Sequence, residues 1–136
     1  MARRGTPLEL RDLANHDCVN FRYQSSGQAL RWPFSVDGKV VELVPDAAIV
    51  IDASDAVAAV VAAGGGIGIS PTYVAAPYVA RGELTPLFPE FAVDRSSITA
   101  LWPESRRGSP NVKAFVGFLE ELFPNPTTWD EIVRNA

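Results

Sequence analysis

The chain has 136 residues, of which 47% are hydrophobic and 21% are charged, the proportions of an ordinary globular domain. Its length suits one domain and is short for a two-domain enzyme, and its formal net charge of -4 at pH 7 argues against nonspecific nucleic-acid binding, which needs a basic face. The single cysteine, Cys18, excludes an internal disulfide and fits a reducing compartment. Residues 1–10 lack the apolar core of a signal peptide and no apolar run could cross a bilayer, so we expect a cytoplasmic protein without a membrane segment.

The N-terminal third predicts a helical turn followed by strands. Leucines spaced among charged residues favour a turn and short helical segment over 6–16, and apolar and aromatic residues favour a strand over 18–23 that ends in a polar loop. Residues 29–45 form the clearest local pattern, since two strand-like runs flank Asp37-Gly38, a pair that supplies positive φ in a type I′ turn. We therefore expect a β-hairpin there, with Pro33 at an edge or bulge because it lacks an N–H donor.

A strand, a helix and a glycine-rich run follow the hairpin. Residues 47–52 are apolar and β-branched, which favours a strand, and Asp52 or Ser54 can then cap a helix with a valine stripe. Gly64 is well placed to end that helix in the left-handed conformation. The glycines therefore follow a helix, and residues 66–70 predict a strand with so few side chains that it suits close backbone approach.

The order of these elements decides against a phosphate-binding loop. Such a loop needs a strand before it and a helix after it, so that the helix N-terminus faces the anion. Here a helix comes before the glycines, the pattern Gly66-x-Gly68-x-x-Pro71 lacks the third glycine of a dinucleotide fingerprint, and no Gly-Lys-Ser/Thr follows. We therefore expect a structural role for the glycines.

The next segment predicts a second helix and a strand. Ser70 as the cap and Pro71 at the first helical position begin this helix, which Pro77 should interrupt or kink and Gly82 should stop. Residues 84–88 then predict a short strand.

The C-terminal part predicts one further strand and two helices. Residues 96–103 alternate as a strand does, and residues 109–123 carry the apolar stripe of a helix that Ser109 caps. A last short helix starts at Thr127, with Asp130 in the position of a capping-box acid. The alternation of strands and helices along the whole chain predicts an α/β fold.

Isolated reactive residues do not combine into a catalytic or metal site. His16 and Cys18 could suggest a base and a nucleophile, but two positions on one extended segment do not by themselves make a hydrogen-bonded pair, and a buried cysteine with a capping or surface histidine is favoured. A metal site would need more ligands than the chain has. Asp52 and Asp55 stand at a helix start, where capping is the simpler explanation. From the residues alone we expect no enzyme, no metal and no cofactor.

Five stretches of the chain follow one another in an order that is similar to that of a known family. In chain order they are GTPLELRDLANHDCVNFR, LRWPFSVDGKVVELVP, IDASDAVAAVVAAGGGIGISP, VARGELTPLF and LWPESRRGSPNVKAFVGFLEEL. The first carries the pattern G-x-P-x-x-x-x-DL-x-x-H-x-C and the second the hairpin pattern W-x-F-x-x-x-G. Over residues 5–122 this order resembles the effector-binding domain of LysR-type transcriptional regulators.

The resemblance implies a periplasmic-binding-protein-like (type 2) lobe, in which helices flank a mixed sheet, together with a strand and a helix of the partner lobe. Residues 8–90 would form the second lobe, and residues 91–136 would return to the first. The family's winged helix-turn-helix and the front of its first lobe would be absent, with Met1 near the hinge, so we expect no direct DNA contact from this chain. The helix at 109–123 would then expose an apolar face, and we expect a homo-oligomer or pairing with the missing front half.

In that family a small molecule binds between the two lobes and shifts the oligomeric regulator between two arrangements, without a chemical reaction. A carboxylate-bearing effector would suit Arg22. Two other classes stay open: a solute-binding protein lobe that serves transport, against which the missing export signal argues, and a small enzyme that uses Cys18. By the resemblance, the candidate effector-binding residues are Phe21, Arg22, Tyr23, Ser25, Asp52, Ser54, Ile67, Gly68 and Ser70.

Overall fold

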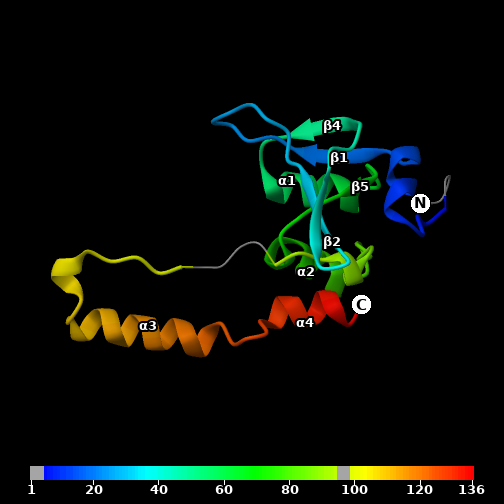
Figure 1. The fold of residues 1–136 in the computed structure, drawn as a ribbon. Coiled ribbons are helices and arrows are strands. Elements are labelled where there is room, and N and C mark those ends of the chain that lie inside the picture. The colour runs from blue at the N-terminus through cyan, green and yellow to red at the C-terminus, as the bar shows by residue number, and fades with distance from the viewer. Residues whose placement is uncertain (1–4, 95–98) are drawn as a thin grey trace.

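Three parallel strands form the central sheet, in the spatial order β4 (Ala47–Ile51), β1 (Cys18–Phe21) and β5 (Ile67–Gly68) (Figure 1). The computed structural model describes residues 5–94 and 99–136. The middle strand is β1, whose Val19 lies opposite both Ile49 and Gly68. This central place explains why the first three residues of β1 are buried. The strands predicted at 18–23 and 47–52 are confirmed, and the thin strand predicted at 66–70 is reduced to two residues.

A two-stranded hairpin stands beside this sheet and is formed by β2 (Trp32–Val36) and β3 (Lys39–Leu43). Asp37 has φ of 50° and Gly38 has φ of 73°, so both turn residues have the positive φ that the sequence predicted. Pro33 is tolerated because both strands of a two-stranded sheet are edges. Parallel and antiparallel strand pairs both occur, as expected for a mixed sheet, but they lie in two separate sheets. In the loop that joins β1 to β2, the described strand pairing is one isolated bridge between Arg22 and Ala29.

Helices and a 3-10 turn surround the strands, and all of the helices predicted in this part of the chain are confirmed. The helix α1 packs against each strand of the parallel sheet and against α2. Apolar side chains from the 3-10 turn, both sheets and the start of β5 form one buried cluster. The elements are η1 (Leu10–Asn15), α1 (Ser54–Ala62) and α2 (Thr72–Ala80), and the cluster is Leu13, Cys18, Trp32, Phe34 and Ile67.

The starts of α1 and α2 differ from the predictions by one residue. Neither Asp52 nor Ser54 caps α1, because the extended residue before its first turn is Ala53. The prediction of Ser70 as the cap of α2 is also wrong, since Pro71 occupies that position and the helix begins at Thr72. Side-chain capping patterns identify a helix start only to within a residue or two.

The course and the end of α2 follow from its packing. The helix continues through Pro77 to Ala80, so the predicted interruption is wrong. A proline removes one helical hydrogen bond, but Ala76 and Val79 on either side of it are buried and hold the last turn in place. Gly82 ends the helix with φ of 71°, as predicted, and Gly64 ends α1 with φ of 89°.

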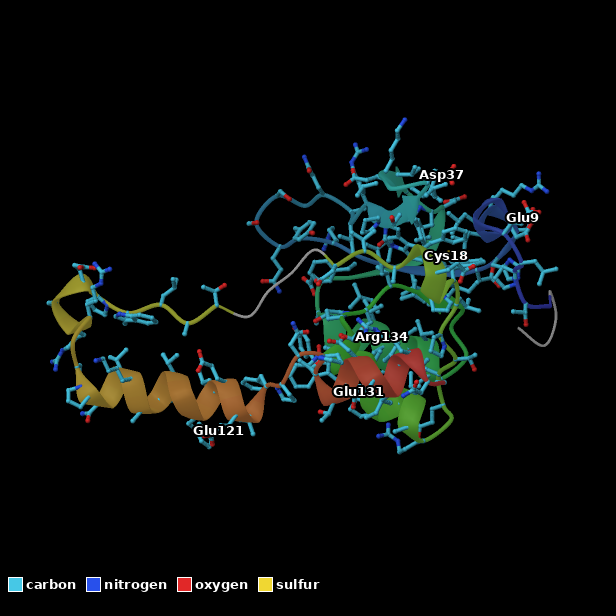
Figure 2. The ribbon with its side chains drawn as sticks, turned by 60° about the horizontal axis from the view of Figure 1, so that its bottom comes forward. Glu9, Cys18, Asp37, Glu121, Glu131 and Arg134 are labelled. Atoms are coloured by element: carbon cyan, nitrogen blue, oxygen red, sulfur yellow. The ribbon has the colours of Figure 1, made fainter. Side chains whose placement is uncertain are left out.

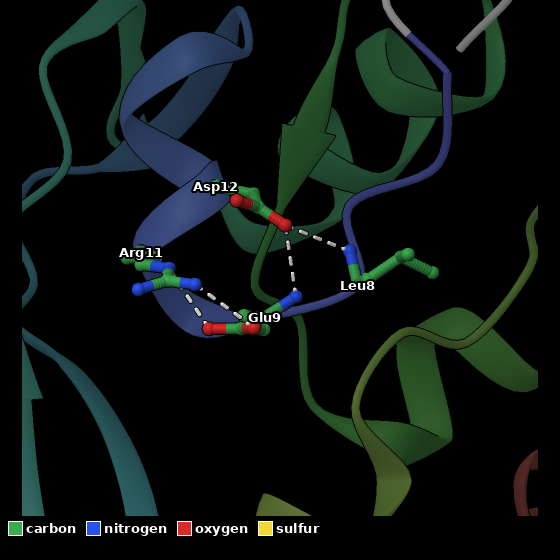
Figure 3. A network of polar contacts seen from close by, with 4 residues as sticks. All are labelled: Leu8, Glu9, Arg11 and Asp12. Carbon is green, nitrogen blue, oxygen red and sulfur yellow. Dashed lines mark hydrogen bonds and ion pairs between the residues drawn. The ribbon is translucent and has the colours of Figure 1, made fainter.

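A small polar network holds the start of η1 (Figure 3). One carboxylate oxygen of Asp12 accepts hydrogen bonds from the backbone N–H groups of Glu9 and Leu8, each at 3.0 Å. These two bonds hold the pKa of Asp12 below its usual value. Arg11 forms an exposed ion pair with Glu9 at 2.8 Å. The chain therefore enters β1 from a turn that its own side chains stabilise.

The C-terminal part forms an arm with the elements η3 (Glu104–Arg106), α3 (Pro110–Leu122) and α4 (Thr128–Arg134). Figure 1 shows α3 standing away from the two sheets, while α4 returns and lies along α2. The predicted helix starts at Ser109 and Thr127 are confirmed as N-cap positions, and the Thr127 hydroxyl accepts a hydrogen bond from the Asp130 N–H at 3.4 Å.

Two predicted strands are absent from the described residues. Residues 84–88 form no strand, and a 3-10 turn, η2 (Pro89–Phe91), follows them. Of the strand predicted at 96–103, residues 96–98 lie outside the described part of the chain and residues 99–103 are not paired as a strand. An apolar alternation becomes a strand only where another strand pairs with it, and in the described structure neither segment is hydrogen-bonded to a strand.

Candidate functional site

Three chain segments meet at one edge of the central sheet. Because β4, β1 and β5 are parallel, their carboxyl ends lie at the same edge, where Asp52, Arg22 and the segment 69–70 follow them. The Arg22 N–H donates a 2.7 Å hydrogen bond to the carbonyl oxygen of Ile51, which fixes the end of β1 beside the end of β4. In parallel α/β sheets, ligands bind in the crevice outside the carboxyl ends of the strands. We call this part of the molecule the carboxyl edge.

Most of the candidate residues lie at or close to the carboxyl edge. Arg22 and Asp52 are exposed there, Ser54 begins α1 and Ser70 comes shortly before α2. Phe21 and Tyr23 are in contact, with ring centroids 5.2 Å apart in an edge-to-face arrangement. The remaining loop residue, Ser25, is exposed between β1 and β2.

Two candidates occupy the interior of the sheet. Ile67 belongs to the buried cluster together with Leu13 and Cys18. Gly68 pairs with Val19, and a β-carbon at Gly68 would lie 2.8 Å from a methyl group of Val61 on α1. These positions therefore join the sheet to its helix, and the half-buried residues Ile69 and Ser70 follow them at the carboxyl edge.

A hollow of about 170 Å³ lies beside the loop that follows β1. It reaches from Tyr23 to the start of the hairpin and has both a guanidinium and a carboxylate in its wall. Among its lining residues, sequence reasoning named only Tyr23 as a candidate effector-binding residue. The other lining residues are Gln28, Ala29, Leu30, Arg31 and Glu42.

A buried asparagine on β1 was missed by sequence reasoning. Asn20 is 1% exposed, and its side-chain oxygen accepts hydrogen bonds from the backbone N–H of Phe21 and from Nε1–H of Trp32, both at 2.8 Å. Its side-chain nitrogen donates to the carbonyl oxygen of Leu30 at 3.1 Å. The signal that could have revealed it is an amide side chain within the otherwise apolar run Cys18–Phe21.

Cys18 and His16 do not form a nucleophile and base. Cys18, labelled in Figure 2, is buried at the start of β1, and its thiol faces backbone carbonyl oxygens, with His16 O at 3.6 Å and Leu13 O at 3.8 Å. The ring nitrogens of His16 contact the carbonyl oxygens of Asp12 at 2.9 Å and Gly5 at 3.3 Å. Burial raises the pKa of the Cys18 thiol, and the nearby carboxylates add to this effect. This environment disfavours the thiolate that a catalytic cysteine needs.

Two further properties concern the described residues as a set. Within residues 5–94 and 99–136, no three His, Cys, Asp or Glu side chains gather as they would around a metal ion. In the same residues, no helix combines the length and the apolar character that spanning a membrane requires.

Comparison with known proteins assigns this arrangement to a family. The family model described as the LysR substrate binding domain matches residues 1–124. The chain is 30% identical over 119 residues to YcaN of Escherichia coli K12, whose name describes an HTH-type transcriptional regulator, a match that covers 88% of this chain and 38% of YcaN. It is 30% identical over 129 residues to a Pseudomonas aeruginosa PAO1 protein whose name describes a transcriptional regulator, covering 90% of this chain and 40% of that protein.

The chain thus spans about two-fifths of the length of these two regulators. A third relative, YagP of Escherichia coli K12, is 26% identical over 106 residues, and its name describes a LysR family substrate-binding domain. The match covers 78% of both chains, so YagP is about as long as this chain. The chain belongs to the LysR substrate-binding domain family.

Proposed function

We propose that this chain is the ligand-sensing part of a LysR-type transcriptional regulator in the bacterial cytoplasm. It binds a small molecule at the carboxyl edge, without catalysis or a cofactor, and other parts of the regulator contact DNA. The family assignment supports ligand binding, and the names of the two regulator relatives support the role in transcription.

The observation that carries this proposal is the meeting of Arg22, Asp52 and Ser70 at one edge, beside the starts of α1 and α2. The free N–H groups and positive dipole end of a helix favour an anion nearby. The Arg22 guanidinium can donate two parallel hydrogen bonds to a carboxylate. The ligand class that best fits this edge is therefore a small carboxylic acid, with Tyr23, Ser25 and Ser54 at its border.

Residues 8–90 cover only one side of a ligand at this edge. The second wall of the site comes from the other lobe of the family's domain. A ligand that contacts both lobes binds their closed arrangement more tightly than the open one, and this difference in affinity shifts the population of the regulator's arrangements. The transcriptional output follows from that shift.

The test is a thermal-shift screen of small carboxylic acids on the purified chain. A ligand at about 100 times its Kd stabilises the protein by roughly 2.7 kcal/mol. Arg22→Ala should remove the stabilisation, whereas Arg106→Ala, on the distant turn η3, should retain it. A ligand that stabilises the unaltered chain and Arg22→Ala equally would contradict the proposed site.

A stand-alone binding module without a DNA-binding part is the second candidate. The similarity to YagP favours it, because the name of that relative describes a substrate-binding domain and the match covers 78% of it. Reading the genomic DNA upstream of the Met1 codon separates the two candidates. An in-frame helix-turn-helix and first lobe support the regulator, and their absence supports the module.

A further inference from the structure

We propose that Asn20 is the positioning residue of the ligand loop, defined as residues 22–29, and that Trp32 reports what happens at that loop. The proposal rests on the proposed function, since it assigns the residue that holds Arg22 and Tyr23 at the carboxyl edge. Neither Asn20 nor Trp32 touches the exposed surface of this edge: both are almost fully buried.

The role of Asn20 begins where the sheet loses a strand. Backbone N–H groups along a strand point alternately to its two sides. The Arg22 N–H donates to β4 at Ile51, so the Phe21 N–H points to the opposite side, where β5 runs. The described pairing with β5 ends at Val19 and Gly68, which leaves the Phe21 N–H beyond the end of that ladder. The side-chain oxygen of Asn20 accepts this bond at 2.8 Å in place of a strand.

The same amide ties down the far end of the ligand loop. Its nitrogen donates to the carbonyl oxygen of Leu30, while the Leu30 N–H donates to the carbonyl oxygen of Phe21 at 2.7 Å. Leu30 is therefore bonded in both directions to the end of β1. Between these ties the loop is closed by the bridge of Arg22 with Ala29 and by the bond from the Tyr23 N–H to the Gln28 carbonyl oxygen at 2.9 Å.

Trp32 links this tie to the hairpin. Its indole N–H donates to the oxygen of Asn20 that also receives the Phe21 N–H. Removing the Asn20 side chain would leave two donors and one carbonyl oxygen without these partners at the base of the loop. Such groups are costly when buried, so the base would open to admit water. Arg22 and Tyr23 would then lose their fixed place beside Asp52.

The first experiment measures amide hydrogen exchange by mass spectrometry in the unaltered chain, Asn20→Ala and the control Asn111→Ala on exposed α3. Loss of one buried tie worth about 1.4 kcal/mol corresponds to about tenfold faster exchange. This acceleration is expected in residues 21–31 of Asn20→Ala, with α1 unchanged. Unchanged exchange in the loop, or equal acceleration in α1, would overturn the proposal.

A conservative variant keeps the test informative if Asn20→Ala does not fold. Asn20→Asp retains the oxygen that accepts from Phe21 and Trp32 and loses the donor to Leu30. The exchange rate in residues 21–31 of Asn20→Asp should then lie between the rates in the unaltered chain and in Asn20→Ala. If Asn20→Ala does not fold, the rate in Asn20→Asp should still exceed that in the unaltered chain. Exchange at the unaltered rate in Asn20→Asp would contradict a role for the Leu30 tie.

The second experiment follows the indole N–H signals by nuclear magnetic resonance while succinate, a simple carboxylate probe, is added. Succinate should shift the signal of Trp32 and leave that of Trp102, on the distant arm, in place. In Asn20→Ala the apparent Kd should rise about tenfold while the fold is retained. A shift at Trp102 of the same size, or an unchanged Kd in Asn20→Ala, would overturn the reporter and positioning roles. If the unaltered chain does not bind succinate, the proposed carboxylate site is contradicted. The hydrogen-exchange experiment then tests by itself whether Asn20 positions the ligand loop.

Discussion

The N–H of Ile67 donates a 2.9 Å hydrogen bond to the carbonyl oxygen of Asp17, and this bond draws the preceding Gly66 against the same carbonyl group. A β-carbon at Gly66 would overlap the Asp17 carbonyl oxygen, and the φ of 130° at Gly66 is one that other residues rarely adopt. The glycine-rich run thus joins the exit of α1 to the start of β1 by direct backbone contact. This is the structural role that the order of elements predicted.

Gly66→Ala should therefore be among the most damaging small substitutions in the lobe. Strain from the backbone angle and overlap with the Asp17 backbone carbonyl should together lower the free energy of unfolding by about 2–4 kcal/mol. The control is Gly64→Ala, which meets the same kind of positive φ but has open space around it and should cost about 1 kcal/mol. Urea unfolding followed by circular dichroism measures both. Equal losses would show that close contact at Gly66 has no energetic effect.

The docking of α4 on α2 should weaken in acid. The Thr127 hydroxyl donates a 2.6 Å hydrogen bond to the Asp130 carboxylate, and this bond, followed by one from the Thr72 side chain on α2, lowers the pKa of Asp130. A carboxylate with a lowered pKa in the folded state stabilises that state above its unfolded pKa of about 3.9. The contribution is lost as the pH falls through the lowered value.

Asp130→Asn should consequently destabilise α4 at pH 7 and have little effect in strong acid. Trp129 reports this locally, because its ring lies between those of Tyr73 and Phe123, with centroids 6.5 Å and 5.4 Å away. Its indole N–H signal, which nuclear magnetic resonance resolves from those of Trp32 and Trp102, should during urea unfolding separate the variant from the unaltered chain only at the higher pH. Glu131→Gln, at the next and exposed position of α4 (Figure 2), is the matched control. A difference between Asp130→Asn and the unaltered chain that persists in acid would contradict this account.

Cys18 should behave as a core residue and not as a nucleophile. It is 1% exposed and its thiol has a raised pKa, so a thiol reagent can react only after the lobe opens. Alkylation by iodoacetamide should be slower in the folded chain than in urea by on the order of a hundredfold or more. Cys18→Ala should cost about 1–2 kcal/mol through the cavity that it leaves. Fast alkylation of the folded chain would restore the enzyme hypothesis.

Sequence reasoning succeeded where a local pattern carries the physics. Asp37-Gly38 determines a turn by itself, because few residues adopt positive φ at two successive positions. The amphipathic stripe of α3 and the hydroxyl of Thr127 likewise depend on neighbours within one or two helical turns. The resemblance to a family named Arg22 and Asp52 as candidates, and the parallel pairing of β4 with β1 in the structure puts both at the carboxyl edge; their role in binding stays a prediction.

The missed strand and the overlooked asparagine both involve partners that are distant in sequence. Residues 84–88 have the composition of a strand, but in the described structure they pair with no strand, and Phe88 adopts a positive φ instead. Asn20 was overlooked because two of its three side-chain bonds join β1 to residues ten and twelve positions away, a relation that no periodicity encodes. Ile67 illustrates the same limit, since its burial against Leu13 depends on the packing of η1 on the sheet.

The apolar face of α3 leads to a final prediction, that the chain associates with itself. Phe115 and Phe118 are 58% and 57% exposed, and Leu101 on the neighbouring segment is 90% exposed. A groove of about 380 Å³ runs between that segment and α3. Exposed apolar surface of this kind is rare on a soluble monomer and promotes association. We expect concentration-dependent sedimentation and fluorescence of an apolar dye such as ANS.

The variants Phe115→Lys and Phe118→Lys should each weaken this association about tenfold or more, since burying one aromatic side chain contributes roughly 1.5–3 kcal/mol. The lobe should unfold at the same urea concentration in both variants, because the α3 face that they change lies outside its core. Glu120→Lys makes a charge change on the side of α3 opposite both phenylalanines, by the spacing of residues along a helix, and should leave the association unchanged. A monodisperse monomer that binds no dye would contradict the prediction, because the two phenylalanines would then not form an interface between copies of the chain in solution.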